Sequence, residues 1–70
     1  MMFRVTVFYR EPLYAKYAGV EERQYRGSFV VSASGEDEAV KRALAEFREV
    51  QAQSSVSWSR VIDRWECLRL

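Results

Sequence analysis

The sequence of 70 residues predicts a two-layer α+β domain with the order strand, strand, helix, strand (ββαβ). Three observations predict it: two segments in which apolar side chains alternate with polar ones, one segment with apolar side chains three or four residues apart, and a final alternating segment. A right-handed crossover through the helix places the third strand beside the first. We therefore expect a three-stranded antiparallel sheet in the order 2-1-3, with one helix packed on one face, in a single domain covering residues 1–70.

The first strand is expected at Phe3–Arg10, where β-branched and aromatic residues are frequent and period-two alternation is clear. Pro12 lacks an amide donor and restricts the backbone of Glu11, so the strand should end before it. The face toward the helix would carry Phe3, Val5, Val7 and Tyr9, and the opposite face would carry Arg4, Thr6, Phe8 and Arg10.

The segment Leu13–Gln24 is longer than a tight hairpin turn and is expected to be a connecting loop, with a single helical turn at Tyr14–Ala18 as an option. The second strand is expected at Tyr25–Ala33, where Gly27 marks a bulge or a close backbone approach. The face toward the helix would carry Tyr25, Phe29, Val31 and Ala33, and the opposite face would carry Arg26, Ser28, Val30 and Ser32.

The helix is expected at Glu36–Ala52, and it should end near Ala52–Ser54. Ser34 can cap its free amide groups, and Asp37 lies three residues later, where a capping-box acid would lie. One apolar stripe runs along the helix through Val40, Ala43, Leu44, Phe47 and Val50.

The third strand is expected at Trp58–Leu70, where Asp63 interrupts the alternation. We choose the register that turns Trp65 toward the helix, because this side chain carries the largest apolar area. That register also turns Val61 and Cys67 toward the helix and places Arg60, Ile62, Arg64, Glu66 and Leu68 on the opposite face. A slip of one residue, or a bulge, would invert it.

The composition argues against catalysis and against a bound metal or cofactor. There is no histidine, so the common general base and every histidine-containing metal site are excluded. The single cysteine, Cys67, lies between Trp65 and Leu68, which favours a packing role over a nucleophilic one. The acids Glu36–Glu38 are expected to complement the helix dipole, since consecutive helical residues diverge too far to share a cation. We expect a protein that is not an enzyme.

The same counts bear on location. One cysteine cannot form an internal disulfide, which fits a reducing compartment and predicts a cytoplasmic protein. The apolar run near the N-terminus is too short for a signal peptide or a membrane span, so no membrane association is expected.

The sheet face opposite the helix is the main candidate for function. Its candidate interaction residues are Phe8, Val30, Ile62, Arg4, Arg26 and Arg64. Apolar side chains at the centre with arginines at the rim are typical of a protein–protein interface. Two alternatives remain: the arginines bind single-stranded nucleic acid, or the face is merely solvated. The net charge of only +1 and the presence of one aromatic residue on this face, Phe8, favour a protein partner over nucleic acid.

Small size also favours a partner, because a domain of this length buries only about 60% of its unfolded-chain surface. We therefore predict a protein-interaction module that associates with itself, as a homodimer, or with another protein, through the open face or through a sheet edge. A second candidate surface is the loop carrying Tyr14, Lys16 and Tyr17, which mixes aromatic and cationic groups. The alternative is that both tyrosines cover one end of the core.

The stretch Val31–Val40 resembles the strand–turn–helix junction of small antitoxins that neutralise RNA-cleaving toxins. The resemblance covers only this short stretch and consists mostly of helix-capping residues. The proline-containing segment of that group is missing between the first two strands, so the resemblance assigns no family.

Overall fold

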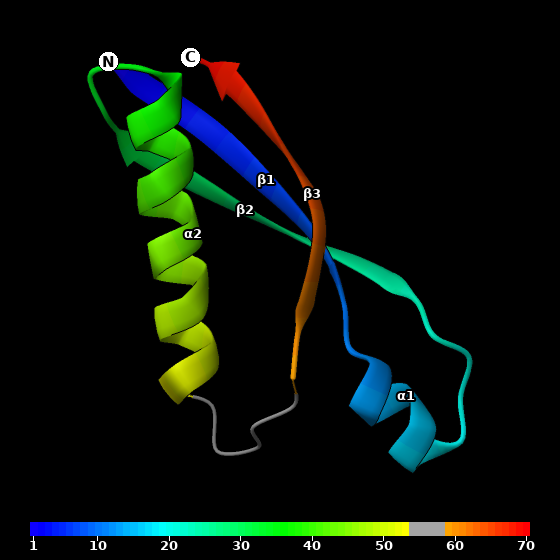
Figure 1. Ribbon diagram of the computed structural model, residues 1–70. Helices are drawn as coiled ribbons and strands as arrows, with labels where there is room; N and C mark the ends of the chain where they lie inside the picture. The colour runs from blue at the N-terminus through cyan, green and yellow to red at the C-terminus, as the bar shows by residue number, and fades with distance from the viewer. Residues whose placement is uncertain (54–58) are drawn as a thin grey trace.

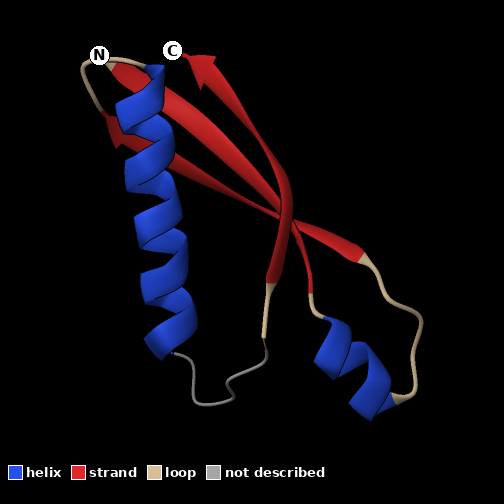
Figure 2. Cartoon of the chain, in the orientation of Figure 1, coloured by secondary structure: helices blue, strands red, loops and turns tan. Residues whose placement is uncertain are grey.

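The computed structural model describes residues 1–53 and 59–70 of the chain. Its elements, in chain order, are β1 (Met2–Arg10), α1 (Pro12–Ala18), β2 (Gln24–Ser32), α2 (Glu36–Gln53) and β3 (Val61–Arg69). The central strand β1 pairs antiparallel with both neighbours, in the order β2-β1-β3 (Figure 1). The long helix α2 packs on one face of this sheet (Figure 2). The predicted α+β fold is confirmed, with α1 as an additional short helix.

The core lies between α2 and the central strand. The three largest fully buried side chains, Phe3, Val5 and Val7, all come from the face of β1 predicted to turn toward the helix. The helix contributes small side chains together with one large ring: Ala39, Ala43 and Phe47. The alanines let the helix backbone approach the sheet, so the core is thin and depends on few large side chains.

Helix α1 occupies part of the segment that we predicted as a loop with at most one helical turn. Pro12 stands at the start of the helix, where its missing amide hydrogen costs nothing. Gly19 ends it in the left-handed conformation, with φ 69° and ψ 30°, and the Val20 amide donates to the Ala15 carbonyl at 3.0 Å. The helix lies at the end of the molecule away from both termini (Figure 1).

At the start of α2, the acidic residue that bonds Ser34 is Glu38, not the predicted Asp37. The Gly35 carbonyl accepts a hydrogen bond from the Ala39 amide at 3.0 Å. The Glu38 carboxylate accepts hydrogen bonds from the hydroxyl and the backbone amide of Ser34. Glu38 therefore takes the role expected of Asp37. The hydroxyl bond, the amide bond and the nearby Arg42 lower the pKa of Glu38.

Arg42 then connects α2 to the end of β2. Its guanidinium forms an ion pair with Glu38 at 2.7 Å, one turn earlier on the helix. It also donates to the Ser32 carbonyl at 2.8 Å. The turn between β2 and α2 is therefore tied to the helix by a charged side chain.

The register of β3 differs from the predicted one because the strand contains a bulge at Asp63. Phe8 pairs with Arg64 and Tyr9 pairs with Ile62, so Asp63 has no partner on β1. Ile62 therefore turns toward the helix and packs against the core, whereas Val61 lies opposite Arg10 and is 41% exposed. The prediction for these two residues was wrong.

Beyond the bulge, the predicted register holds. Trp65 lies opposite Val7 and Cys67 lies opposite Val5, so both are on the helix side of the sheet. No bulge occurs at Gly27, since β2 pairs with β1 without a shift. The predicted start of the third strand at Trp58 lies outside the described residues, as does Ser54 at the predicted end of the helix.

Candidate interaction surface

The open face, meaning the side of the sheet opposite α2, has three cross-strand rows at its centre. Residues that pair directly across an antiparallel sheet project from the same face. The rows are Arg26–Phe8–Arg64, Ser28–Thr6–Glu66 and Val30–Arg4–Leu68. The structure thus brings together five of the six predicted interaction residues: Phe8, Val30, Arg4, Arg26 and Arg64. Ile62 is absent from this face because of the bulge, and Leu68 extends the set.

Phe8 is not the exposed apolar centre that we expected. The Arg64 guanidinium carbon lies 3.8 Å from the centroid of the Phe8 ring, and Phe8 is only partly exposed. Arg64 is also held by Glu66, whose carboxylate oxygen lies 2.6 Å from its Nη1 atom. The side chain of Arg64 therefore covers the ring and is fixed from two sides.

The exposed apolar side chains of the open face gather instead around Arg4, near the chain termini. Val30 is 54% exposed and Leu68 is 58% exposed, on either side of Arg4. Met2 and Leu70 form the next row, where the Leu70 amide donates to the Met2 carbonyl at 2.9 Å. We call Met2, Val30, Leu68 and Leu70 the terminal apolar patch. Four large exposed apolar side chains therefore lie on the rows of Arg4 and Met2, near one end of the open face.

The arginines of the open face differ in their partners. Within residues 1–53 and 59–70, neither Arg4 nor Arg26 forms an ion pair, whereas Arg10 and Arg64 do. Two positive charges are therefore free to meet an anionic group or to form part of an interface rim.

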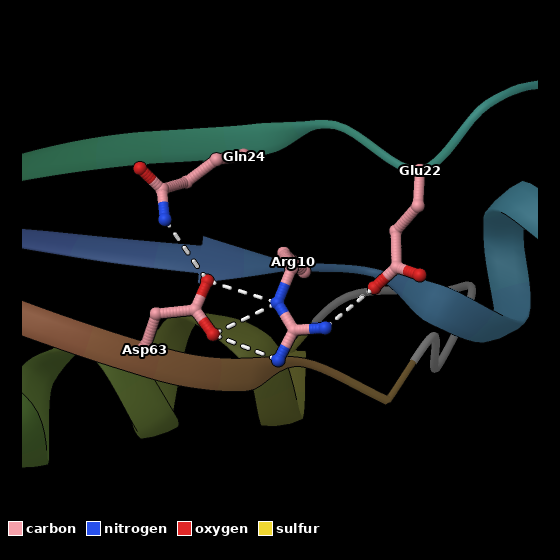
Figure 3. A network of polar contacts seen from close by, with 4 residues as sticks. All are labelled: Arg10, Glu22, Gln24 and Asp63. Atoms are coloured by element: carbon pink, nitrogen blue, oxygen red, sulfur yellow. Dashed lines mark hydrogen bonds and ion pairs between the residues drawn. The ribbon is translucent and has the colours of Figure 1, made fainter.

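A polar network closes the other end of the open face (Figure 3). Arg10 donates from Nε to both Asp63 carboxylate oxygens, at 2.8 and 2.9 Å, and its Nη1 bonds to Glu22 at 2.9 Å. The Gln24 amide donates to the same Asp63 carboxylate at 3.1 Å. The side chain of the bulged residue is thus held by both of the other strands, which stabilises the bulge.

These hydrogen bonds, first from Gln24 and then from Arg10, lower the pKa of the Asp63 carboxyl. A carboxyl with a depressed folded-state pKa stabilises the fold above its unfolded-state pKa, about 4, and the stabilisation is lost as the pH falls through the folded-state value. In the wild type, the free energy of unfolding should fall as the pH is lowered from about 5 to 2, because Asp63 becomes protonated. We expect a smaller fall in Asp63→Asn. Urea unfolding across that range measures it. Equal pH dependence in the variant and the wild type would contradict this role.

Arg60 was predicted on the open face and lies on the helix side instead, before the bulge. Its guanidinium carbon is 5.1 Å from the Tyr9 ring centroid and 5.4 Å from that of Phe47. Its Nε atom lies 3.8 Å from a carboxylate oxygen of Glu11. Arg60 therefore covers one end of the core.

Trp65 is an exposed apolar side chain on the helix side of β3. Trp65 is 49% exposed although it faces the same side as the core. Its neighbour Cys67 packs against the core, and this burial, with the negative charge of Glu36, raises the pKa of the Cys67 thiol. A raised thiol pKa disfavours the thiolate that a nucleophile requires.

The three residues of the predicted binding loop lie on α1. Tyr17 is 83% exposed and Tyr14 is 39% exposed, so neither tyrosine is buried over the core. Lys16 is exposed in the last turn of the same helix. The structure places these residues away from the open face, at the far end of β1 and β2 (Figure 1).

In the described part of the chain, no three acidic or cysteine side chains are grouped so that they could hold a metal ion. Neither α1 nor α2 has the length and apolar character needed to span a bilayer. Comparison with protein-family models, with curated proteins and with solved structures found no match to this chain.

Proposed function

We propose that this chain is a small, non-catalytic protein-interaction module that associates with a second copy of itself through its sheet. The observation that supports this most strongly is the accessible surface, 5110 Å². A folded monomer of 8.2 kDa is expected to expose about 4,500 Å². The excess, about 600 Å², approaches the roughly 800 Å² that each partner buries in a specific interface of ordinary size.

The shape of the molecule supports the same proposal. The radius of gyration is 13.3 Å, whereas a compact domain of this length has about 11 Å. The strands run at an angle to α2, and β1 and β2 lead away from it toward α1, so the helix covers only part of one face of the sheet (Figure 2). A thin, elongated domain with a small core gains stability when a partner covers this surface.

Chemistry supports a non-catalytic role. The sequence has no histidine to serve as a general base, and the raised pKa of Cys67 disfavours nucleophilic attack. We also propose a cytoplasmic location, supported by the single cysteine, which has no second cysteine with which to form an internal disulfide.

Self-association is tested by sedimentation equilibrium over a concentration series. We expect a mass of twice 8.2 kDa at high concentration. Leu68→Ser should weaken association by about tenfold, as truncation of an interface residue worth more than 1 kcal/mol does. The matched control is Leu13→Ser, since Leu13 is similarly exposed, at 53%, but lies on α1. A mass of 8.2 kDa at millimolar concentration would overturn the proposal.

A second candidate function is binding of single-stranded nucleic acid, favoured by Arg4 and Arg26 on the open face, which form no ion pair with any described residue. Against it, Arg64 covers the ring of Phe8, so that this face of the ring is not available for base stacking. Fluorescence anisotropy with a labelled single-stranded RNA tests it. Salt-dependent binding that disappears in Arg4→Glu/Arg26→Glu would favour this second function.

A further inference from the structure

We infer that the second copy adds to the outer edge of β3, antiparallel, about a two-fold axis at Trp65. The two sheets would then form one continuous sheet with α2 of both copies on the same side. This inference rests on the proposed self-association and specifies its surface and register. Strand addition at an exposed edge is a common recognition mode, and a two-fold axis makes the contact self-limiting.

The backbone of β3 offers the required hydrogen-bonding groups. The Leu70 amide bonds to the Met2 carbonyl on β1 at 2.9 Å. Alternate residues of an antiparallel strand point their amide and carbonyl groups to the same neighbour. Leu68, Glu66 and Arg64 therefore point toward β1, and the backbone groups of Trp65 and Cys67 point to the free edge. With the axis at Trp65, each Trp65 amide can donate to the Trp65 carbonyl of the other copy.

The charges of β3 are complementary to themselves about this axis. Arg64 would lie opposite Glu66 of the second copy, and Glu66 opposite its Arg64, both on the open face. Their side chains are 54% and 63% exposed, so each can accept a second partner while keeping the present ion pair. Moving the axis by one residue would place Arg64 opposite Arg64 or Glu66 opposite Glu66. Like charges directly opposite are destabilising, so charge disfavours both neighbouring registers, and the axis at Trp65 forms two ion pairs.

The bulge at Asp63 also places apolar side chains of the two copies opposite each other when the axis lies at Trp65. In the pairing of β1 with β3, Asp63 has no partner, and Tyr9 lies opposite Ile62 and Arg10 opposite Val61. A second β3 that pairs in the same way would set its Cys67 opposite Ile62 and its Leu68 opposite Val61. Leu68 and Val61 are both exposed on the open face, at 58% and 41%. Their contact would remove apolar surface from water in both copies.

Trp65 completes the contact on the helix side. Its side chain is about half exposed because α2 leans toward β2 and leaves the outer part of β3 uncovered (Figure 1). At the axis, the two Trp65 side chains would meet between the two helices. Large aromatic side chains buried at the centre of an interface dominate binding free energies.

The other free edge, that of β2, lacks this complementarity. The Ala33 amide bonds to the Met1 carbonyl, so Ala33, Val31 and Phe29 point toward β1 and Ser28 points outward. A two-fold axis at Ser28 would set Arg26 opposite Val30, with no ion pair. The observations therefore favour β3.

The test uses two charge reversals of the full chain, Glu66→Arg and Arg64→Glu. Each variant alone would place like charges across the axis, and we expect its self-association to weaken by tenfold or more. An equimolar mixture would restore both ion pairs between the two different chains, so we expect it to associate as tightly as the wild type. Sedimentation velocity and native mass spectrometry of the mixture measure this, with circular dichroism confirming that each variant folds.

The matched control is a pair of opposite charge reversals on the exposed surface of α2, Arg48→Glu and Glu49→Arg, which should leave association unchanged. A wild-type dimer that is insensitive to the β3 reversals would overturn the edge pairing but leave self-association standing. Single variants that dissociate without recovery in the mixture would overturn the register. A wild-type chain that stays monomeric would overturn both proposals.

Discussion

Phe47→Ala is expected to leave the chain mostly unfolded at 25 °C. Phe47 is 3% exposed on α2, and its ring contacts Tyr9 edge-on at 5.0 Å and Phe29 at 6.3 Å between centroids. Truncation of a buried phenylalanine costs about 3–5 kcal/mol. Domains of this size rarely have more than about 3–5 kcal/mol of net stability, so this one change removes most of it. In the part of the chain that the structure describes, the largest fully buried side chains, Phe3, Val5 and Val7, all come from β1.

Urea unfolding followed by circular dichroism measures the effect. Phe47→Leu is the control, because leucine keeps most of the buried apolar volume and should cost clearly less stability than alanine. Phe8→Ala is a second control, since Phe8 lies on the open face under Arg64 and not in the core. If Phe47→Ala unfolds at the same urea concentration as Phe8→Ala, the assignment of the core is wrong.

Ile62→Ala is expected to destabilise the fold by about 2 kcal/mol, and Val61→Ala by about 0.5 kcal/mol or less. Ile62 packs against the core, whereas its neighbour Val61 lies exposed opposite Arg10. The lower end of the usual range applies to Ile62 because this side chain is only partly buried. The difference between these two adjacent residues depends entirely on the bulge.

The midpoints of urea unfolding compare the two variants directly, at a concentration low enough to keep the chain monomeric. This condition matters because Val61 also takes part in the proposed dimer contact. A larger loss for Val61→Ala than for Ile62→Ala would show that β3 is regular and that Asp63 pairs with β1.

The position of α1 could have been predicted from local signals. Pro12 and Gly19 stand at the start and just past the end of the helix, an arrangement typical of short helices. The segment between them shows no clear apolar stripe, because it buries only Ala15. Apolar periodicity therefore does not indicate this helix, whereas the two flanking residues do.

The local sequence by itself determined the fold class and most of the core. Alternation over Phe3–Tyr9 and the helical spacing of Ala43 and Phe47 match the faces that these elements bury, because side-chain direction follows from backbone geometry. The strand order followed from the handedness of the crossover, a constraint that is independent of side-chain detail. For these features, nothing beyond residue pattern and chain connectivity was needed.

The tertiary structure decided the side on which Ile62 lies and, with it, the composition of the open face. The alternation of β3 is broken at Asp63, so the sequence was compatible with two registers. Arg10 and Gln24, which lie 53 and 39 residues away along the chain, hold the Asp63 carboxylate and stabilise the bulge. A period of two carries no information about an inserted residue, and only contacts between strands specify where it lies. The cover of Phe8 by Arg64 has the same origin, since that pair exists only once the two strands are in register.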